Sequence, residues 1–348
     1  MRPMFQPALV NGLTGDPALY VDFLFERRAL LFDLGDVGAL PTRKLLRVSH
    51  AFVTHTHMDH FVGFDRLLRT CVGRATAVHL FGPPGFCAQV GHRLAAYTWN
   101  LVDNYETNFT ITVTELTPGG EAQSARFQCR RRFACEALAP TTIVDGVLLE
   151  DDSFRVRAAL LDHQVPCLGF VLEEKAHVNV WKNRLAELGL PVGPWLRELK
   201  RCVTRGDSDD TTFRAWWREG GKLHERTLSL GRLKADVLRV VPGQKIGYVT
   251  DVAGHADNCA RIVALVRDAD LLYIETMFLD EDAAHAERKF HLTARQAGAI
   301  ARHAGAGKAL PFHVSPRYAG AEWRIVAELE EACGAPVHAT RARSGDDA

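Results

Sequence analysis

The sequence predicts an α/β protein made of two halves with alternating strands and helices and an arm inserted between them. Short apolar runs bounded by turn residues recur up to about residue 172, polar and helical stretches fill residues 173–239, and regular alternation returns from residue 240. A chain of 348 residues fits one large core with an insertion. We therefore expect an N-terminal half over 1–172, an inserted arm over 173–239 and a C-terminal half over 240–348.

Most elements of the N-terminal half are expected to be strands, because their apolar residues alternate or form short runs. The turn Gly82-Pro83-Pro84-Gly85 closes one of them. The expected strands are Leu19–Glu26, Ala29–Asp33, Val48–Val53, Ala77–Phe81, Phe109–Leu116, Ala125–Phe133 and Phe154–Leu161, and the expected helices are His60–Leu68 and Phe86–Trp99.

In the arm, helical spacing predicts helices over Val178–Leu188 and Trp195–Cys202 on either side of Gly189–Pro194. The C-terminal half then alternates regularly, which indicates strands joined by helices. Its expected strands are Lys245–Thr250, Asp270–Glu275 and Ala309–His313, and its expected helices are Ala256–Val266, Thr293–His303 and Trp323–Cys333.

Composition excludes several classes of protein. The chain has 42 Lys and Arg residues and 42 Asp and Glu residues, so its formal net charge is zero. A polyanion partner would therefore have to bind a local basic patch, because the molecule as a whole has no net positive charge to attract it. No apolar run approaches the roughly 20 residues of a membrane span. The N-terminus lacks the apolar core of a signal peptide and the eight cysteines form no CxxC pair, so we expect a cytoplasmic protein with reduced thiols.

The sharpest feature is the run Thr54-His55-Thr56-His57-Met58-Asp59-His60, which follows the apolar Ala51-Phe52-Val53. On an extended segment His55 and His57 point to the same side and can bind one metal ion, while the next turn offers Asp59 and His60 to a second. Imidazole and carboxylate together suit zinc, although manganese or iron accepts the same ligands. A solvated polar loop is the alternative, and three histidines with an acid at a strand end disfavour it.

Four side chains do not complete two metal sites, so further ligands are expected at other strand ends. Candidates are Asp162-His163, Thr250-Asp251 and His313 with Ser315, each directly after an apolar strand. A single His or Asp at a strand end is more often structural. Their common position is what makes this set a candidate metal centre.

The order of these segments resembles ribonuclease Z, the tRNA 3′-processing endonuclease branch of the metallo-β-lactamase superfamily. The HxHxDH motif of that family is matched by residues 55–60, its later metal histidine by His163, its bridging aspartate by Asp251 and its last metal histidine by His313. The resemblance covers the chain from about Leu30 to Tyr318.

Other segments carry the resemblance further. Asp33 matches the acidic residue of the first family motif, where we expect it to orient the metal loop rather than to bind metal. Ile274–Phe278 is similar to the HEATF segment, with Ile274 in place of its histidine, and His291–Thr293 is similar to the HST segment. Leu188–Arg201 is similar to a stretch in or beside the substrate-gripping arm of the family.

The resemblance implies a metallo-β-lactamase-type αββα sandwich with an inserted arm, two zinc ions and a homodimer. Manganese or iron is an alternative to zinc. The metal ligands implied by the resemblance are His55, His57, Asp59, His60, His163, Asp251 and His313.

The catalytic roles follow from the two expected metals. Two zinc ions about 3.5–4 Å apart share a hydroxide and clamp the phosphoryl oxygens of an in-line displacement. Asp59 would accept or orient the proton of the nucleophile, and His291, held by Glu275, is the family's candidate for protonating the leaving group. Ser315 and Arg317 are candidates for holding phosphate, because a guanidinium matches phosphate oxygens.

We therefore expect a zinc-dependent phosphodiesterase, an endoribonuclease that cleaves tRNA precursors at the 3′ side by metal-bound hydroxide. A small-molecule hydrolase of the same fold, such as a lactonase, thioesterase or cyclic-nucleotide phosphodiesterase, is one alternative. A metal-retaining RNA-binding scaffold is another. Candidate RNA contacts are the basic residues Arg126, Arg130, Arg131 and Arg132 on one expected strand, Lys200, Arg201 and Arg205 near the arm, and the stacking residues Trp195, Trp216 and Trp217.

Overall fold

The computed structural model describes residues 4–24, 26–175 and 177–334 and divides into two compact units. The larger unit contains Phe5–Leu148, Arg157–Val171 and the chain from Lys245 onward. The smaller unit contains Leu149–Val156 and Leu172–Gln244, which includes the expected arm. No helix among the described residues is long and apolar enough to cross a bilayer.

An eight-stranded sheet forms the N-terminal part of the fold, with its strands in chain order. Strand β3 pairs in parallel with β4, β4 with β5 and β5 with β6, while the remaining pairs are antiparallel. The strands are β1 Phe5–Leu9, β2 Leu19–Phe23, β3 Ala29–Phe32, β4 Val48–Phe52, β5 Ala77–Gly82, β6 Thr110–Leu116, β7 Glu121–Gln128 and β8 Cys135–Thr142. The helices between them are α1 Thr42–Leu45, α2 Met58–Phe61, α3 Phe64–Cys71 and α4 Phe86–Ala95, with short 3-10 turns η1 Val102–Asn104 and η2 Cys129–Arg131.

A second, six-stranded sheet has the order β18-β17-β16-β11-β10-β9. Strands β16, β17 and β18 are parallel, so their carboxyl ends meet at one edge. The strands are β9 Val147–Glu150, β10 Phe154–Asp162, β11 Pro166–Glu174, β16 Lys245–Val249, β17 Leu271–Glu275 and β18 Ala309–Phe312. The helices that follow are α8 Ala256–Val266, α9 Ala283–Lys289, α10 Ala294–Ala304 and α11 Glu322–Cys333, with 3-10 turns η3 Asp280–Asp282 and η4 Pro316–Tyr318.

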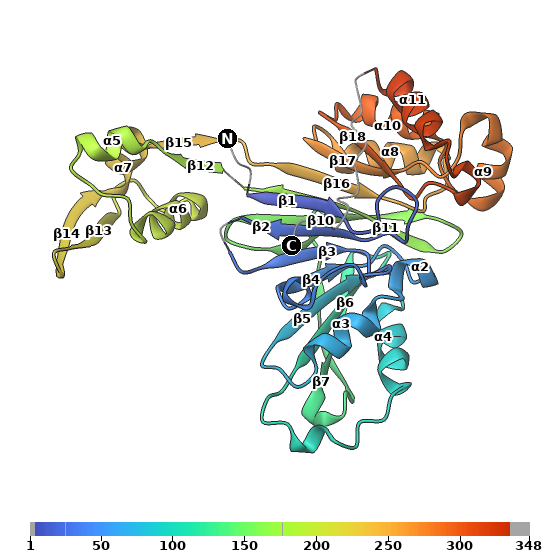
Figure 1. The fold of residues 1–348 in the computed structure, drawn as a ribbon, viewed down its shortest axis with the longest axis horizontal. Coiled ribbons are helices and arrows are strands. Elements are labelled where there is room, and N and C mark those ends of the chain that lie inside the picture. Colours follow the sequence, from blue (N-terminus) through green and yellow to red (C-terminus); the bar gives the residue numbers. More distant parts are fainter. Residues whose placement is uncertain (1–3, 25, 176, 335–348) are drawn as a thin grey trace. The chain divides into compact units, whose positions relative to one another are not determined.

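Helices cover the outer faces of both sheets, which gives the αββα layers that the resemblance implies. Figure 1 shows α3 and α4 beside β4–β6, and α8, α10 and α11 beside β16–β18. Apolar residues fill each helix–sheet interface, for example Phe64 and Leu80 in the first and Ile262 and Leu272 in the second.

Aromatic rings join the two sheets at their facing sides. The Phe32 and Phe52 rings of the first sheet stack at 5.1 Å between centroids, and the Tyr248 ring of β16 lies 5.7 Å from Phe32. Phe170 of β11 contacts both phenylalanines. Close packing here fixes where the strand ends of one sheet lie relative to those of the other.

The smaller unit has its own hydrophobic cluster, formed by Trp195, Leu199, Phe213, Leu230 and Leu233 among others. Trp195 is therefore a core residue and not an exposed surface on which a base could stack. The elements of this unit between β11 and β16 are β12 His177–Val180, α5 Lys182–Glu187, α6 Trp195–Arg205, β13 Thr212–Glu219, β14 Lys222–Ser229, α7 Leu230–Val237 and β15 Leu238–Val241.

The structure corrects several secondary-structure predictions in this arm. The expected helix Val178–Leu188 begins as strand β12, because Val178–Val180 pair with Leu238–Val240 before helix α5 starts at Lys182. The hairpin β13–β14 was not predicted, because β14 is exposed at seven of its eight positions and so lacks the alternation that marks a half-buried strand.

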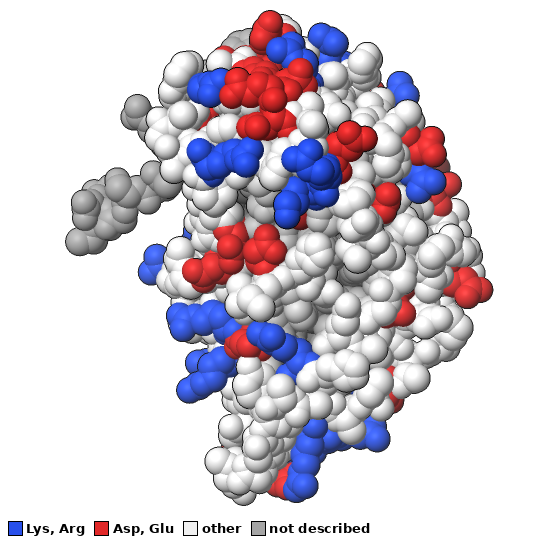
Figure 2. All heavy atoms as spheres, turned by 90° about the vertical axis from the view of Figure 1, so that its right-hand side faces the viewer, with Lys and Arg blue, Asp and Glu red and all other residues white. Residues whose placement is uncertain are grey.

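The first sheet and the expected basic strand also need correction. The expected strand Ala125–Phe133 ends at Gln128, because Cys129–Arg131 form a 3-10 turn. The four arginines therefore do not share one strand. Arg131 and Arg126 share Glu136, and Arg132 pairs with Asp103, so two carboxylates offset part of the charge of these three arginines. Figure 2 likewise shows acidic and basic side chains together on one face, with other residues between them.

Candidate metal centre

The HxHxDH segment is a loop that leaves β4 and enters the short helix α2. His57 occupies the N-cap of α2, and Asp59 and His60 lie in its first turn. Gly63, two residues beyond α2, allows the loop to approach the backbone after β3, because a Cβ atom there would lie 2.1 Å from the carbonyl oxygen of Gly35. The backbone amide of Leu34 donates to the carbonyl of His60 at 2.9 Å, which ties the loop down.

Three other candidate ligands follow strands of the second sheet. His163 follows β10, Asp251 lies two residues after the end of β16, and His313 follows β18. Asp251 and His313 have positive φ angles of 53° and 55°, a left-handed backbone conformation that costs free energy in residues other than glycine. Strained residues of this kind gather at functional sites when the surrounding structure holds them in place.

The structure brings all seven predicted ligands together in two groups that share one carboxylate. The first group contains His55, His57, His163 and Asp251, whose ligand atoms lie within 4.8 Å of one another. Oδ2 of Asp251 lies 3.7 Å from Nε2 of His55 and 3.4 Å from Nε2 of His163.

The second group contains Asp59, His60 and His313 and meets the other oxygen of Asp251. Oδ1 of Asp251 lies 3.2 Å from Nε2 of His60 and 2.9 Å from Nδ1 of His313. Oδ2 of Asp59 lies 3.5 Å from Nε2 of His60 and 3.4 Å from Nε2 of His313. Asp251 thus faces both groups, one oxygen to each, as a bridging ligand would.

Unpaired nitrogen atoms support the fit of these groups to metal ions. Nε2 of His55 and Nε2 of His60 are buried and have no hydrogen-bond partner among the described residues. Burying such a polar atom without a partner costs about 1–3 kcal/mol. A cation bound between these nitrogens and the carboxylates would satisfy them, and the imidazole and carboxylate donors suit zinc.

Electrostatics inside the cluster favours a bound cation. Burial and then the neighbouring His60 lower the pKa of His55 to about 2, so His55 is a neutral ring with a free lone pair. Burial disfavours charge on His60, but Asp251 and Asp33 outweigh it and raise the pKa of His60 to about 10. Burial also disfavours the charged form of Asp59, yet the hydrogen bond from His313 and the charge of His60 lower the pKa of Asp59 to about 2. Ionised carboxylates thus face histidines whose protons a metal ion would displace.

The pair His291 and Glu275 lies beside the two groups. Nδ1 of His291 is 2.8 Å from Oε2 of Glu275, and Glu275 is fully buried. The other oxygen of Glu275 accepts the backbone amides of Val252 and Leu292, which fixes the carboxylate. The His291 ring lies 4.9 Å from that of His163 and 5.7 Å from that of His313, so it borders a ligand of each group.

The predicted phosphate-binding residues lie on η4, just after His313. The backbone amide of Arg317 donates to Oγ of Ser315 at 3.4 Å, which is a local turn contact. The Arg317 guanidinium pairs with Asp282 at 3.1 Å and lies over the ring of Phe278. Phosphate binding by Arg317 stays a prediction. To bind phosphate, the guanidinium must either contact phosphate and Asp282 at the same time or break its ion pair with Asp282.

Apart from Asp33, which was expected to orient the metal loop, sequence reasoning missed the residues that orient the ligands. Oγ1 of Thr54 lies 3.1 Å from Nδ1 of His55, and Oγ1 of Thr250 donates to Asp251 at 2.7 Å. The carbonyl oxygen of Phe290 lies 2.8 Å from Nδ1 of His163. Threonine next to a ligand was the one available signal, because the remaining contacts join residues far apart in the chain.

Comparison with known proteins places this centre in a family. A protein described as "Ribonuclease Z" from Deinococcus radiodurans is 31% identical over 334 residues, which are 94% of this chain and 96% of the relative. The chain belongs to the ribonuclease Z family. A family model described as "Beta-lactamase superfamily domain" matches residues 225–314, which include Asp251, Glu275, His291 and His313.

Solved structures agree on the fold. The short form of human tRNase Z has a TM-score of 0.51 at 19% identity, covering 90% of this chain and 92% of that chain. The metallo-β-lactamase fold protein YhfI from Bacillus subtilis has a TM-score of 0.53 at 15% identity, covering 95% of both chains. The chain is therefore a metal-dependent hydrolase of the ribonuclease Z family with the metallo-β-lactamase fold.

Proposed function

We propose that the protein is a dinuclear zinc phosphodiesterase, an endoribonuclease that cleaves tRNA precursors at the 3′ side. The observation that carries this proposal is the division of seven ligand side chains into two groups joined through the two oxygens of Asp251. Two bound zinc ions would lower the pKa of a water molecule and draw negative charge from the phosphoryl oxygens. Manganese or iron would supply the same chemistry.

The chain's own residues supply the proton transfers. Asp59 belongs to the second group, is partly exposed and has a low pKa, so its ionised carboxylate can orient an attacking nucleophile or accept its proton. Burial opposes the charged form of His291, but Glu275 outweighs burial and raises the pKa of His291. Because Nδ1 of His291 is held by Glu275, Nε2 is the atom that can protonate the leaving-group oxygen.

Substrate comparison tests the function directly. Zinc-loaded protein is expected to cleave bis-p-nitrophenyl phosphate and precursor tRNA and to leave a lactone intact. Turnover of the lactone with no RNA cleavage would favour the small-molecule hydrolase. Tight binding of RNA without turnover of any of the three substrates would favour the scaffold.

Metal content gives the first quantitative test. Purified protein reloaded with zinc is expected to bind close to two equivalents per chain, because two ligand groups are present. Elemental analysis after removal of loosely bound zinc measures this number. His60→Ala, which removes a ligand of the second group alone, is the matched variant and is expected to keep about one equivalent. One equivalent in the unaltered protein would mean that Asp59, His60 and His313 form no metal site.

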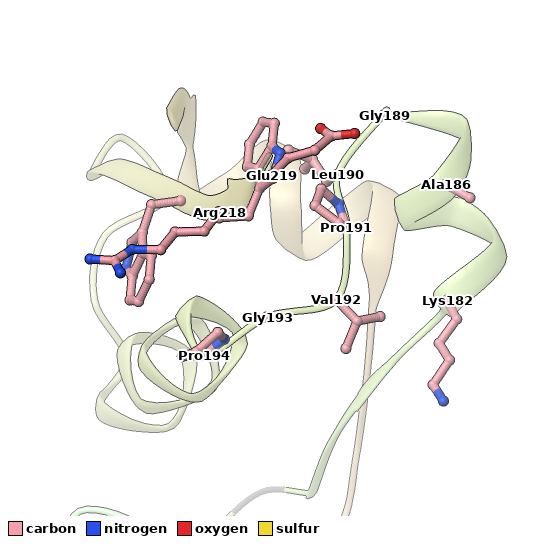
Figure 3. Close-up of a pocket in the computed structure, with 12 residues that line it drawn as sticks. Lys182, Ala186, Gly189, Leu190, Pro191, Val192, Gly193, Pro194, Arg218 and Glu219 are labelled. Atoms are coloured by element: carbon pink, nitrogen blue, oxygen red, sulfur yellow. The ribbon is translucent and has the colours of Figure 1, made fainter. Parts of the chain in front are cut away.

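We propose that the arm is the RNA-binding segment. It contains a cavity of about 790 Å³ bordered by the loop Gly189–Pro194, by Trp216 and Trp217 and by the charged residues Lys182 and Arg218 (Figure 3). Aromatic rings stack on bases, and cations contact the phosphate backbone. Lys182 and Arg218 are exposed and have no ion pair within the described part of the chain. By contrast, Arg201 pairs with Asp152 and Arg205 with Asp207, so the cavity is a better candidate contact than these two arginines.

Removal of the arm tests this role. Val180 and Leu238 are paired opposite each other in the β12–β15 strand pair, and the chain between them is Trp181–Val237. This segment can therefore be replaced by Asn-Gly, which forms a two-residue hairpin turn. The deletion takes out nearly the whole hydrophobic cluster of the arm and none of the two main cores. Zinc binding and cleavage of the small phosphodiester are expected to stay within a few fold. Cleavage of precursor tRNA is expected to fall steeply, chiefly through KM, since the arm contributes none of the predicted metal ligands and its contacts would serve binding.

Salt and point variants refine the same test. Raising salt is expected to weaken RNA cleavage by the intact protein toward that of the shortened one, because phosphate contacts are salt-dependent. Lys182→Ala with Arg218→Ala is expected to raise KM for RNA more than Arg201→Ala with Arg205→Ala does. Equal loss of small-substrate and RNA turnover in a folded, zinc-loaded deletion would mark the arm as a lid or dimer contact of a small-molecule hydrolase.

We also infer that the protein acts in the cytoplasm as a homodimer, as its resemblance to the family implies. Light scattering of the purified protein measures the mass of the assembly.

A further inference from the structure

Asp33 lies fully buried at the end of β3, close to the metal groups and outside both of them. Its Oδ1 accepts the backbone amide of Thr54 at 2.7 Å. Its Oδ2 accepts Nδ1 of His60 at 3.0 Å and the hydroxyl of Tyr248 at 3.0 Å. Asp33 also has a positive φ of 58°, so the chain holds it in an unfavourable backbone conformation to keep the carboxylate there.

The Tyr248 hydroxyl reaches Asp33 from the other sheet. Tyr248 belongs to β16, whose end supplies the shared ligand Asp251 three residues later. Its ring stacks on Phe312 at 5.0 Å and packs against Phe32 at 5.7 Å, so the ring cannot swing away. Burial and the charge of Asp33 raise the pKa of Tyr248 well above its usual value. The hydroxyl therefore stays protonated and donates a hydrogen bond to the Asp33 carboxylate.

The contact with Asp33 distinguishes His60 from His55 and His163, the buried ligand histidines of the first group. Nδ1 of His55 faces the hydroxyl of Thr54, and Nδ1 of His163 faces the carbonyl of Phe290, whereas Nδ1 of His60 faces a carboxylate. A carboxylate on the far nitrogen fixes the ring orientation, directs Nε2 toward the metal and increases the basicity of the ligand. Asp33 contacts His60 directly and reaches His55 only through the hydroxyl of Thr54, so its position is expected to act on the second metal group more than on the first.

We propose that Tyr248 is a positioning residue for the metal group of Asp59, His60 and His313, on which it acts through Asp33. The inference rests on the proposed dinuclear metal centre. Among the residues that the structure describes, Tyr248 forms no hydrogen bond with a predicted ligand, so its effect would pass through the Asp33 carboxylate. The segment of β16 and the two residues after it thereby supplies both the tyrosine that orients the second group and the ligand that joins the two groups.

Stepwise zinc titration against a competing chelator tests the proposal. His60→Ala and His163→Ala first identify which binding step belongs to which group, since each removes a ligand of one group only. Tyr248→Phe keeps the ring and removes the hydroxyl. It is expected to weaken the step lost in His60→Ala by about tenfold, the lower end of the range for an outer hydrogen-bond partner. The step lost in His163→Ala is expected to change by no more than about twofold.

Two further variants separate positioning from simple packing. Tyr273 is the register partner of Tyr248 on β17, is also buried and lies outside the Asp33 network, so Tyr273→Phe is the matched control. Tyr273→Phe is expected to leave both zinc steps unchanged, whatever it does to the unfolding temperature of the metal-free protein. In a background carrying Asp33→Asn, Tyr248→Phe is expected to cause no further loss of zinc affinity, because the residue through which it acts has already been changed.

Each outcome bears on a distinct claim. Two zinc equivalents in the unaltered protein with both steps unchanged, or both equally weakened, in Tyr248→Phe would overturn the positioning role alone. Full additivity with Asp33→Asn would also overturn it. A single zinc equivalent in the unaltered protein would overturn the dinuclear proposal and this inference with it. If Asp33→Asn does not fold, the comparison of Tyr248→Phe with Tyr273→Phe still decides.

Discussion

Asp251→Ala is expected to remove both metal ions and reduce phosphodiesterase activity to background. Asp251 is fully buried, and its two oxygens face the two ligand groups, so no other side chain can replace it in either. Metal ions stabilise the charge of the transition state by several kcal/mol, which corresponds to a loss of about 10³-fold or more in rate. The loss is expected to be at least as large as that of His57→Ala, which removes a ligand from the first group only.

Zinc content and rate are measured on the same preparation of each variant. Asp257→Ala, an exposed acidic residue on α8, is the matched control and is expected to retain both properties. Retention of two zinc equivalents by Asp251→Ala would show that the groups do not share this ligand. Retention of one equivalent, with loss confined to the second group, would assign Asp251 to that group alone.

His291→Ala is expected to lower kcat for RNA by about 10²–10⁴-fold, the usual contribution of a general acid, while zinc content stays unchanged. An aryl phosphodiester with a good leaving group needs no protonation, so its hydrolysis is expected to be less sensitive. Because Glu275 raises the pKa of His291, the acid is protonated below that pKa and loses its proton above it. The RNA rate should therefore fall as the pH rises through this pKa, and the alanine variant should lack that decline.

The control for this experiment is His285→Ala, a histidine of α9 that belongs to neither proposed metal group. One ligand atom of His291 also lies within 4.8 Å of those of Asp251, Glu275 and His313, so these four residues form a third group close enough to hold an ion. Loss of zinc from His291→Ala would therefore make His291 a ligand or the support of one. Equal sensitivity of aryl and RNA substrates would remove its role as an acid.

Sequence reasoning succeeded where one short segment contains the geometry. Residues 55–60 lie in a single loop and turn, so their spacing alone brings the side chains to one place. His163, Asp251 and His313 were found because chemistry-bearing residues often follow strands, and the two sheets do bring these strand ends together. The interaction between Tyr248 and Asp33 spans 215 positions, and no local pattern signals it.

The failures also have local causes. Val178–Leu188 has apolar residues at helical spacing, yet cross-strand pairing with β15 makes its first residues a strand. Strand β11 was not predicted, because it is buried on both faces and so shows no alternation of apolar and polar residues. The arginines near residue 130 were placed on a strand because nothing in their composition signals the 3-10 turn that ends it.

The left-handed backbone at Asp33, Asp251 and His313 has a consequence for related chains. Glycine would adopt this backbone conformation without strain, so the backbone alone favours glycine at each of the three positions. The contacts of the three side chains within the metal groups, made directly or through His60, favour an aspartate or a histidine there. A homologue that has lost catalysis can acquire glycine at these positions. A homologue that keeps all three side chains retains the backbone strain of a positive φ together with the side chains of the metal centre. We therefore expect aspartate, aspartate and histidine at these three positions in active homologues and glycine at one or more of them in inactive homologues.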